Sequence, residues 1–403
     1  MRLSTQSYYQ RSIAAMLDQQ SALSRIQNQV ASGKKITSPA DDPIAAVHVM
    51  ELERSKQEYA QYEKNSALTR NRLNLEESAI ADAGTVLQRV RELILQASNT
   101  GTLTDQDRES IAIELQSRLE QLQDIGNRKD GNGEYLFAGF STLTQPFVGA
   151  SSGDVVYAGD QGARVLQVGP TQRIADSHSG FDLFMNIPEG NGTFYTRASA
   201  ANTGNGSINV GSVTNPAAWV RDDYTLTFTA ADTWEITDTA TPTPNVVASG
   251  AYTPGDAIDV NGVRVVVSRT PAVGDTFSVN ESRNESVFDT VDRVIDVLRD
   301  PANTPAAVAQ LSTTLEGSLQ QIDQASDHML GVRGQVGARL SSLDTADSAR
   351  EDVGIDIAAS LSDLQDLDYA EALARMNQQL VGLQAAQLSY SQISQLSLFN
   401  YLK

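Results

Sequence analysis

Cysteine is absent from the 403-residue chain, and histidine occurs only three times. Without thiols the chain has no disulfide framework, no thiolate nucleophile and no zinc–thiolate site. Basic residues are also scarce, with 30 lysines and arginines against 50 acids, which gives a net charge of −20. This charge disfavours nucleic acid and an anionic membrane as the main partner, because both are themselves negative.

Long apolar runs are missing as well. No stretch is long and apolar enough to span a bilayer, and residues 1–7 lack the apolar segment of a cleaved signal peptide. Hydrophobic residues nevertheless make up 40% of the chain, which is enough for a core. These features predict a soluble, acidic protein of two or three domains and leave its location open.

Patterns for catalysis or metal binding are few and incomplete. His48, His178 and His328 are isolated from one another in the sequence, which favours local hydrogen bonding over metal ligation. The segment 130–134 lacks the glycine and the distal glutamate of a calcium loop, and 32–35 lacks key residues of a phosphate loop. We therefore expect no catalytic residue, no cofactor, no metal ligand and no enzymatic activity.

The composition changes sharply in the middle of the chain. Residues 141–280 contain no lysine but hold 15 of the 28 glycines and 8 of the 12 prolines. Apolar and polar residues alternate over 224–229 and 233–237, as in strands with one buried face. Asn261-Gly262 separates two further β-rich runs, which predicts a tight hairpin. Residues 141–280 are therefore predicted to form an inserted β domain.

A long helix is predicted directly after residue 42. Asp42 and Pro43 have the residue types of an N-cap and a first helical residue. Apolar residues recur at three-to-four spacing as far as residue 97, with Glu76 as the one polar member. A helix over 43–98 would be about 84 Å long, which is typical of a coiled coil or rod.

Further helices are predicted on either side of the β domain. Thr104 and Asp107 form a capping box for a second helix, which ends before the turn at 130–133. After the β domain, one helix spans 287–299 and a longer one begins at Pro305. The helices on the two flanks carry the same kind of apolar stripe, so we expect them to pack together. The predicted fold is therefore mainly α, a long antiparallel coiled-coil helical bundle from both chain ends with a β-rich insert.

The two ends of the chain are amphipathic but nearly uncharged. Residues 372–403 contain no acid, and glutamine and serine make up their polar face. Neutral polar side chains pack against protein at a lower desolvation cost than charges. We therefore predict that both ends are buried among other copies of the protein, with closure of an intramolecular bundle as the alternative. The predicted assembly interface comprises Ile13, Met16, Leu23, Val30, Leu373, Met376, Leu380 and Leu383.

Several segments resemble the flagellin family. The family's signature in the first long helix is matched at Arg89, Val90, Arg91, Glu92 and Leu93. The segments 32–43, 364–372 and 388–403 are more similar to the member that joins hook to filament than to filament flagellin. The resemblance covers about 1–140 and 281–403, while the β block matches nothing informative.

The resemblance implies an arrangement of segments in an assembled structure. Terminal helices would form an inner tube, with a helical rod outside it and the β domain furthest out. The expected segments are 1–42 (inner tube), 43–140 (rod), 141–280 (β domain), 281–360 (rod) and 361–403 (inner tube). The joint between tube and rod would consist of Gly33, Asp41, Asp42 and Pro43.

The resemblance also implies a structural role in joining hook to filament. The protein would leave the cell through the flagellar type III system without a cleaved signal and reside in the extracellular flagellum. Expected partners are copies of itself in a ring, a neighbouring hook-associated junction protein, flagellin, and a cytoplasmic export chaperone on the C-terminal part. Two alternatives remain: filament flagellin itself, or a secreted adhesin whose β domain binds a surface ligand.

Overall fold

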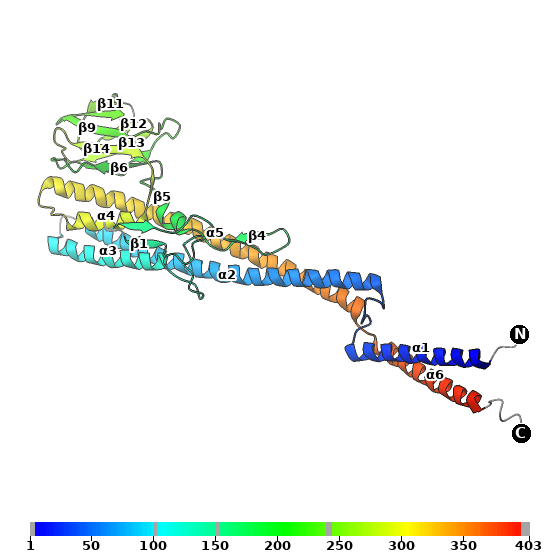
Figure 1. Cartoon of the computed structure of the whole chain (residues 1–403). Coiled ribbons are helices and arrows are strands. Elements are labelled where there is room, and N and C mark those ends of the chain that lie inside the picture. Colours follow the sequence, from blue (N-terminus) through cyan, green and yellow to red (C-terminus); the bar gives the residue numbers. More distant parts are fainter. Residues whose placement is uncertain (1–4, 100–102, 150–153, 239–243, 396–403) are drawn as a thin grey trace, which may run out of the picture. The chain divides into compact units, whose positions relative to one another are not determined.

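The computed structural model describes residues 5–99, 103–149, 154–238 and 244–395 (Figure 1). The chain divides into two compact units. The terminal unit comprises 1–64 and 345–403, and the central unit comprises 65–344. The α-helices of the described residues are α1 (Thr5–Ser32), α2 (Pro43–Ala97), α3 (Asp105–Gly126), α4 (Val287–Arg299), α5 (Pro305–Gln365) and α6 (Tyr369–Gln395).

The helix starts follow local signals in the sequence. α2 begins at Pro43, and Oδ1 of Asp42 accepts hydrogen bonds from the backbone N–H groups of Ile44 (3.1 Å) and Ala45 (3.0 Å). Before α3, Thr104 and Asp107 make the predicted capping box in both directions. Both predicted N-caps are thus confirmed.

In the central unit, α2 and α5 run antiparallel. Their apolar stripes are buried: Leu73, Leu87 and Ile322 are fully inaccessible to solvent. Ion pairs follow the same register, because Arg70 pairs with Asp344 (2.7 Å) while Arg91, further along α2, pairs with Asp323 (2.6 Å). Exposed pairs of this kind contribute little, so burial of the stripes supplies most of the stability.

A group of phenylalanines joins α3 and α4 to the segment that follows α3. The ring of Phe147 lies 5.1 Å from that of Phe288 on α4 and 5.3 Å from that of Phe184. Gly126 and Gly180 allow this approach, because a Cβ on either would lie within 3.0 Å of the Phe147 ring. These rings form the aromatic core of the helical part of the central unit.

The strands confirm the predicted β-rich insert. A five-stranded antiparallel sheet has the order β11-β10-β9-β14-β6, and a second sheet has the order β12-β13-β7 with β8 also paired to β13. The bounds of these strands are β6 Phe194–Ala198, β7 Ser207–Ile208, β8 Ser212–Val213, β9 Tyr224–Ala230, β10 Thr233–Asp238, β11 Asn245–Ala251, β12 Ala257–Val260, β13 Val263–Ser268 and β14 Thr276–Glu281.

Short elements flank the larger sheets in the sequence, most of them between α3 and β6. They form the two-stranded pairs β1–β2, β3–β4 and β5–β15, together with one short π-helix, η1. Their bounds are β1 Phe147–Gly149, β2 Val155–Tyr157, β3 Val165–Gln167, β4 Arg173–Ala175, η1 Phe181–Met185, β5 Ile187–Pro188 and β15 Asn284–Glu285. β5 leads into β6 and β15 follows β14, so this pair lies where the chain enters and leaves the five-stranded sheet.

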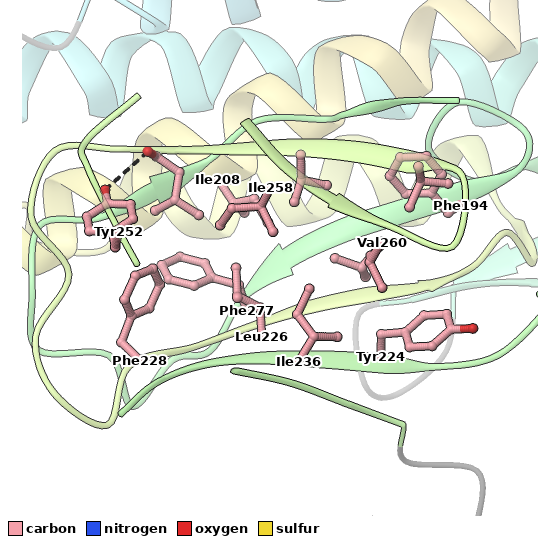
Figure 2. Close-up of a cluster of buried hydrophobic side chains, with 14 residues drawn as sticks. Phe194, Ile208, Tyr224, Leu226, Phe228, Ile236, Tyr252, Ile258, Val260 and Phe277 are labelled. Carbon is pink, nitrogen blue, oxygen red and sulfur yellow. Dashed lines mark hydrogen bonds between the residues drawn. The ribbon is translucent and has the colours of Figure 1, made fainter. Parts of the chain in front are cut away.

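The two larger sheets enclose one hydrophobic core (Figure 2). Leu226 and Phe228 of β9 and Ile236 of β10 have no exposed surface, which follows from the alternating pattern of these strands. The Asn261-Gly262 turn joins β12 to β13 with positive φ at both residues (44° and 81°), as a type I′ hairpin requires. The hairpin prediction is confirmed.

Candidate assembly site

The terminal unit places the first and last described helices side by side. α1 contacts α6, and the helices run in opposite directions (Figure 1). The end of α1 meets the start of α6, because a Cβ on Gly33 would lie 2.9 Å from the hydroxyl of Tyr369. Further along, Gln19 of α1 lies over Gly382 of α6. The antiparallel pair is thus built from segments more than 300 positions apart.

The predicted interface residues divide into two groups. In the first group, Leu23 is buried, and Met16, Val30, Met376, Leu380 and Leu383 are half-buried. In the second group, Ile13 and Leu373 each keep 42% of their surface exposed. The structure thus brings the predicted stripes onto one helix pair but covers them incompletely.

Other apolar side chains of the pair face away from it. Leu17 on α1 is 59% exposed, and Val381 and Leu388 on α6 are 65% and 63% exposed. The polar residues around them on α6 are glutamines and serines, and the described part of this helix beyond Glu371 contains no acid. The outer surface of the pair therefore combines exposed apolar groups with little charge.

Gly382 and Gln19 were missed by reasoning from the sequence. A Cβ on Gly382 would lie 2.2 Å from Nε2 of Gln19, so the Gln19 side chain lies in the space that the glycine leaves on α6. The available signal was a glycine inside a regular helical stripe, between Leu380 and Leu383. Its meaning required the identity of the opposing helix.

The predicted joint is a capped turn between α1 and α2. Gly33 ends α1 with φ of +70°, a left-handed conformation that suits a glycine after a helix. Oδ2 of Asp41 accepts hydrogen bonds from Thr37 N (3.1 Å), Thr37 Oγ1 (3.0 Å) and Ser38 N (2.9 Å). The Thr37 hydroxyl is the main cause of the lowered pKa of Asp41. Asp42 and Pro43 then start α2.

The same joint is bonded to the connection between α5 and α6. Lys35 N donates to Gln365 O (2.6 Å), and Leu367 N donates to Gly33 O (3.0 Å). Lys34 and Asp366 form the antiparallel bridge between these two bonds. The two turns at which the chain enters and leaves the terminal helix pair are therefore one hydrogen-bonded element.

The signature residues hold three helices together in the central unit. Arg89 donates from Nε (2.9 Å) and Nη2 (3.2 Å) to the carboxylate of Glu114 on α3. Arg91 reaches in another direction, to Asp323 on α5. Val90, between these arginines, is fully buried, and Leu93, two residues after Arg91, is 1% exposed. Glu92 also binds Arg89, at 3.0 Å.

Buried charges in the central unit have partners that explain them. Glu76, the polar member of the α2 stripe, accepts hydrogen bonds from His178 N (2.9 Å) and binds its Nδ1 (2.7 Å). Arg72, one turn earlier, pairs with Asp130 (3.0 Å) and Glu134 (3.2 Å). The segment that resembled a calcium loop is therefore a tight turn that presents carboxylates to an arginine.

In the described part of the chain, no group of three or more histidine, aspartate and glutamate side chains is arranged to hold a metal ion. Over the same residues, no helix has both the length and the hydrophobicity needed to cross a membrane. The features that stand out are the helix pair, the joint and the signature cluster.

Comparisons with known proteins agree with this geometry. The family description "Bacterial flagellin N-terminal helical region" matches residues 3–142, and "Bacterial flagellin C-terminal helical region" matches 319–402. The flagellar hook-associated protein 3 of Salmonella typhimurium is 25% identical over 399 residues, covering 99% of each chain.

Solved structures show the same similarity in three dimensions. The chain is 37% identical to hook-associated protein-3 from Legionella pneumophila, with a TM-score of 0.74 over 78% of this chain and 98% of that one. It is 36% identical to FlgL from Xanthomonas campestris, with a TM-score of 0.72 over 77% of this chain and 99% of that one.

The chain therefore belongs to the bacterial flagellin family. Within that family it belongs to the group of hook-associated protein 3, or FlgL, which functions at the junction of flagellar hook and filament. The family, the mainly helical fold and the junction role expected from the sequence are confirmed. The alternatives, filament flagellin and a secreted adhesin, are less supported.

Proposed function

We propose that α1 and α6 assemble with the same helices of neighbouring copies into the inner tube of the hook–filament junction. The observation that carries the proposal is the exposed apolar surface of the helix pair, at Ile13, Leu17, Leu373, Val381 and Leu388. Apolar groups on a charge-poor surface gain free energy when a second protein surface covers them. Glutamine and serine can hydrogen-bond in such an interface without the cost of burying charge.

The domains follow from this proposal. Segments 1–42 and 361–403 form the inner tube, and 43–140 with 281–360 form the rod. Residues 141–280 lie outside the rod. The joint at Gly33 and 41–43 sets the direction in which α2 leaves the tube. Its first turn is bonded to the α5–α6 connection, and its second turn is held by the carboxylate of Asp41.

The partners follow from the same surface. Copies of the chain form a ring through the interface residues, and this ring contacts a hook-associated junction protein on one side and flagellin on the other. Before assembly the apolar surface of α6 needs cover, which suits a cytoplasmic export chaperone on the C-terminal part. Export through the flagellar type III system then places the protein in the extracellular flagellum.

The proposed role is mechanical, and it requires no catalysis. The signature residues support it by tying α2 to α3 and α5 with charge-assisted hydrogen bonds. Their function in this account is to keep the rod helices in register while the junction carries load between hook and filament.

A matched pair of variants tests the assembly role. Val381 on α6 and Val273 in the loop before β14 are both 65% exposed, so Val381→Asp and Val273→Asp place the same charge on equally exposed positions. We expect Val381→Asp to abolish filaments and release flagellin into the medium, while Val273→Asp leaves filaments intact. Both purified monomers should unfold like the unmodified protein. Normal filaments in a strain carrying Val381→Asp would contradict the inner-tube role.

A further inference from the structure

Four Asn-Gly pairs occur in the chain: Asn132-Gly133, Asn191-Gly192, Asn205-Gly206 and Asn261-Gly262. Such pairs are chemically labile, because glycine has no Cβ to keep its backbone nitrogen away from the preceding amide carbon. Their reactivity in a folded protein depends on whether the asparagine side chain is free to rotate.

Three of the four asparagines are held by their side chains inside the β-rich insert. Oδ1 of Asn191 accepts hydrogen bonds from the backbone N–H groups of Thr193 and Phe194, both at 3.0 Å. Oδ1 of Asn205 accepts from Thr270 N (2.8 Å), and Nδ2 of Asn261 donates to the hydroxyl of Tyr224 (2.9 Å). All three asparagines are partly buried.

Asn132 differs from them in both respects. Asn132 and Gly133 are exposed, and the amide side chain of Asn132 has no hydrogen-bond partner within the described residues. Only its backbone N–H is held, by Oδ1 of Asp130 at 2.8 Å. The one contact that must be released for reaction is the hydrogen bond from Gly133 N to Asp130 O (3.1 Å).

We propose that Asn132 is a site of spontaneous deamidation. The backbone nitrogen of Gly133 forms a bond to Cγ of Asn132, and the bond from Cγ to Nδ2 breaks. Ammonia leaves with the proton that Gly133 N has lost. Water then opens the cyclic imide at one of its two carbonyls, which leaves aspartate or isoaspartate at position 132.

The product changes a turn that supports α2. Asp130 and Glu134 flank Asn132, and both bind the buried guanidinium of Arg72. Their position depends on the bonds from Glu134 N to Asp130 Oδ1 (3.0 Å) and from Asp130 N to Glu134 O (2.8 Å). Isoaspartate routes the backbone through Cβ and lengthens the turn, and either product adds a negative charge beside these carboxylates. Conversion at Asn132 therefore loosens the contact between this turn and α2.

Peptide mass spectrometry of the full chain tests the proposal. Trypsin releases 130–164, in which Asn132 is the one asparagine, and the other pairs fall in 174–197, 198–221 and 222–264. After incubation in mildly alkaline buffer, we expect the mass gain of an amide-to-acid change in 130–164. The other pairs should react about tenfold more slowly, because each must first break a side-chain hydrogen bond. In urea all four pairs should react at similar rates.

Two results would contradict the proposal that Asn132 is the reactive asparagine. One is an unchanged 130–164 peptide in the folded protein while the urea-treated chain reacts there. The other is equal reaction at Asn132 and at the three held asparagines in the folded state. An Asn132→Ser variant serves as control, since it has no side-chain amide and should show no mass gain in this peptide.

Hydrogen exchange measures whether conversion at Asn132 loosens the contact between the turn and α2. Hydrogen exchange around Arg72 should accelerate severalfold in the converted protein and stay unchanged in equally incubated Asn132→Ser. Unchanged exchange after full conversion would show that the turn does not support α2, and would overturn that part of the proposal while leaving the reactive site in place.

Discussion

The rod helices of the central unit and the helix pair of the terminal unit are built from similar amphipathic sequence, yet the rod buries far more of its apolar stripe within one chain. Leu73 and Leu87 of α2 are fully buried, and arginines on α2 and α5 pair with acids across the bundle. In the α1–α6 pair, Leu17 and Val381 remain more than half exposed. The rod thus buries its central stripe within one chain, and the poorer cover of the terminal pair supports the proposal that neighbouring copies pack against it.

The largest expected effect is a difference in stability between alanine variants of two leucines. Leu87 is fully buried in the rod, so Leu87→Ala should lower the free energy of unfolding of the central unit by about 2–5 kcal/mol. Leu17 is 59% exposed, so Leu17→Ala should change the stability of the monomer by less than about 0.5 kcal/mol. Urea unfolding of both variants measures the difference. Equal losses would remove the contrast between rod and terminal pair.

The next effect concerns the joint of the terminal unit. Gly33 has φ of +70°, and a Cβ there would lie 2.9 Å from the Tyr369 hydroxyl. We expect Gly33→Ala to destabilise the joint by about 1–3 kcal/mol and to speed amide exchange at Lys35 and Leu367. Gly131→Ala is the matched control, because no atom lies within 4 Å of its Cβ position. Unchanged exchange at Lys35 would show that the backbone at Gly33 is not constrained.

The stability of the central unit should depend on pH through Asp289. Burial, with added repulsion from Asp154 and Asp292, raises the pKa of Asp289 on α4 from 3.8 to about 6. The folded state therefore binds more protons than the unfolded state between pH 4 and pH 6, and the stability contributed by this group is lost as the pH rises through that window. Asp289→Asn should stabilise the central unit at neutral pH and flatten this dependence. Thermal unfolding at several pH values tests it, and an unaltered pH profile would contradict it.

The smallest effect is expected for the ion pairs of the rod. Arg333 and Glu77 lie 2.6 Å apart, and their side chains are 42% and 38% exposed. Exposed pairs contribute about 0–1 kcal/mol, so Arg333→Ala should change the free energy of unfolding by no more than this. A double-mutant cycle with Glu77→Ala isolates the pair. A coupling well above that range would mean that charges, more than apolar stripes, hold the rod together.

Local signals in the sequence were sufficient for much of the fold. The start of α2 at Pro43, the capping box at Thr104 and the hairpin at Asn261-Gly262 depend on neighbouring residues, and each was placed correctly. The helical stripes and the alternating strand pattern of β9 also depend on short repeats. For such elements the physical cause and the visible pattern lie in the same few residues.

Contacts between distant segments were beyond the reach of local patterns. The bond from Lys35 N to Gln365 O and the approach of Gln19 to Gly382 each join opposite ends of the chain. Glu76 illustrates the same limit, since its place in an apolar stripe makes sense only through His178. The candidate interface residues could be selected by pattern and low charge, but their division into covered and exposed groups depends on how α1 meets α6.

Hydrogen exchange of the full chain, compared between dilute monomer and assembled junction, tests the central claim most directly. We expect peptides from α1 and α6 to exchange rapidly in the monomer, while those around Leu87 in α2 exchange slowly. In the assembly, α1 and α6 should become as protected as α2. If α1 and α6 are already as protected as α2 in the monomer and gain nothing on assembly, the terminal pair is complete in one chain and the account is wrong.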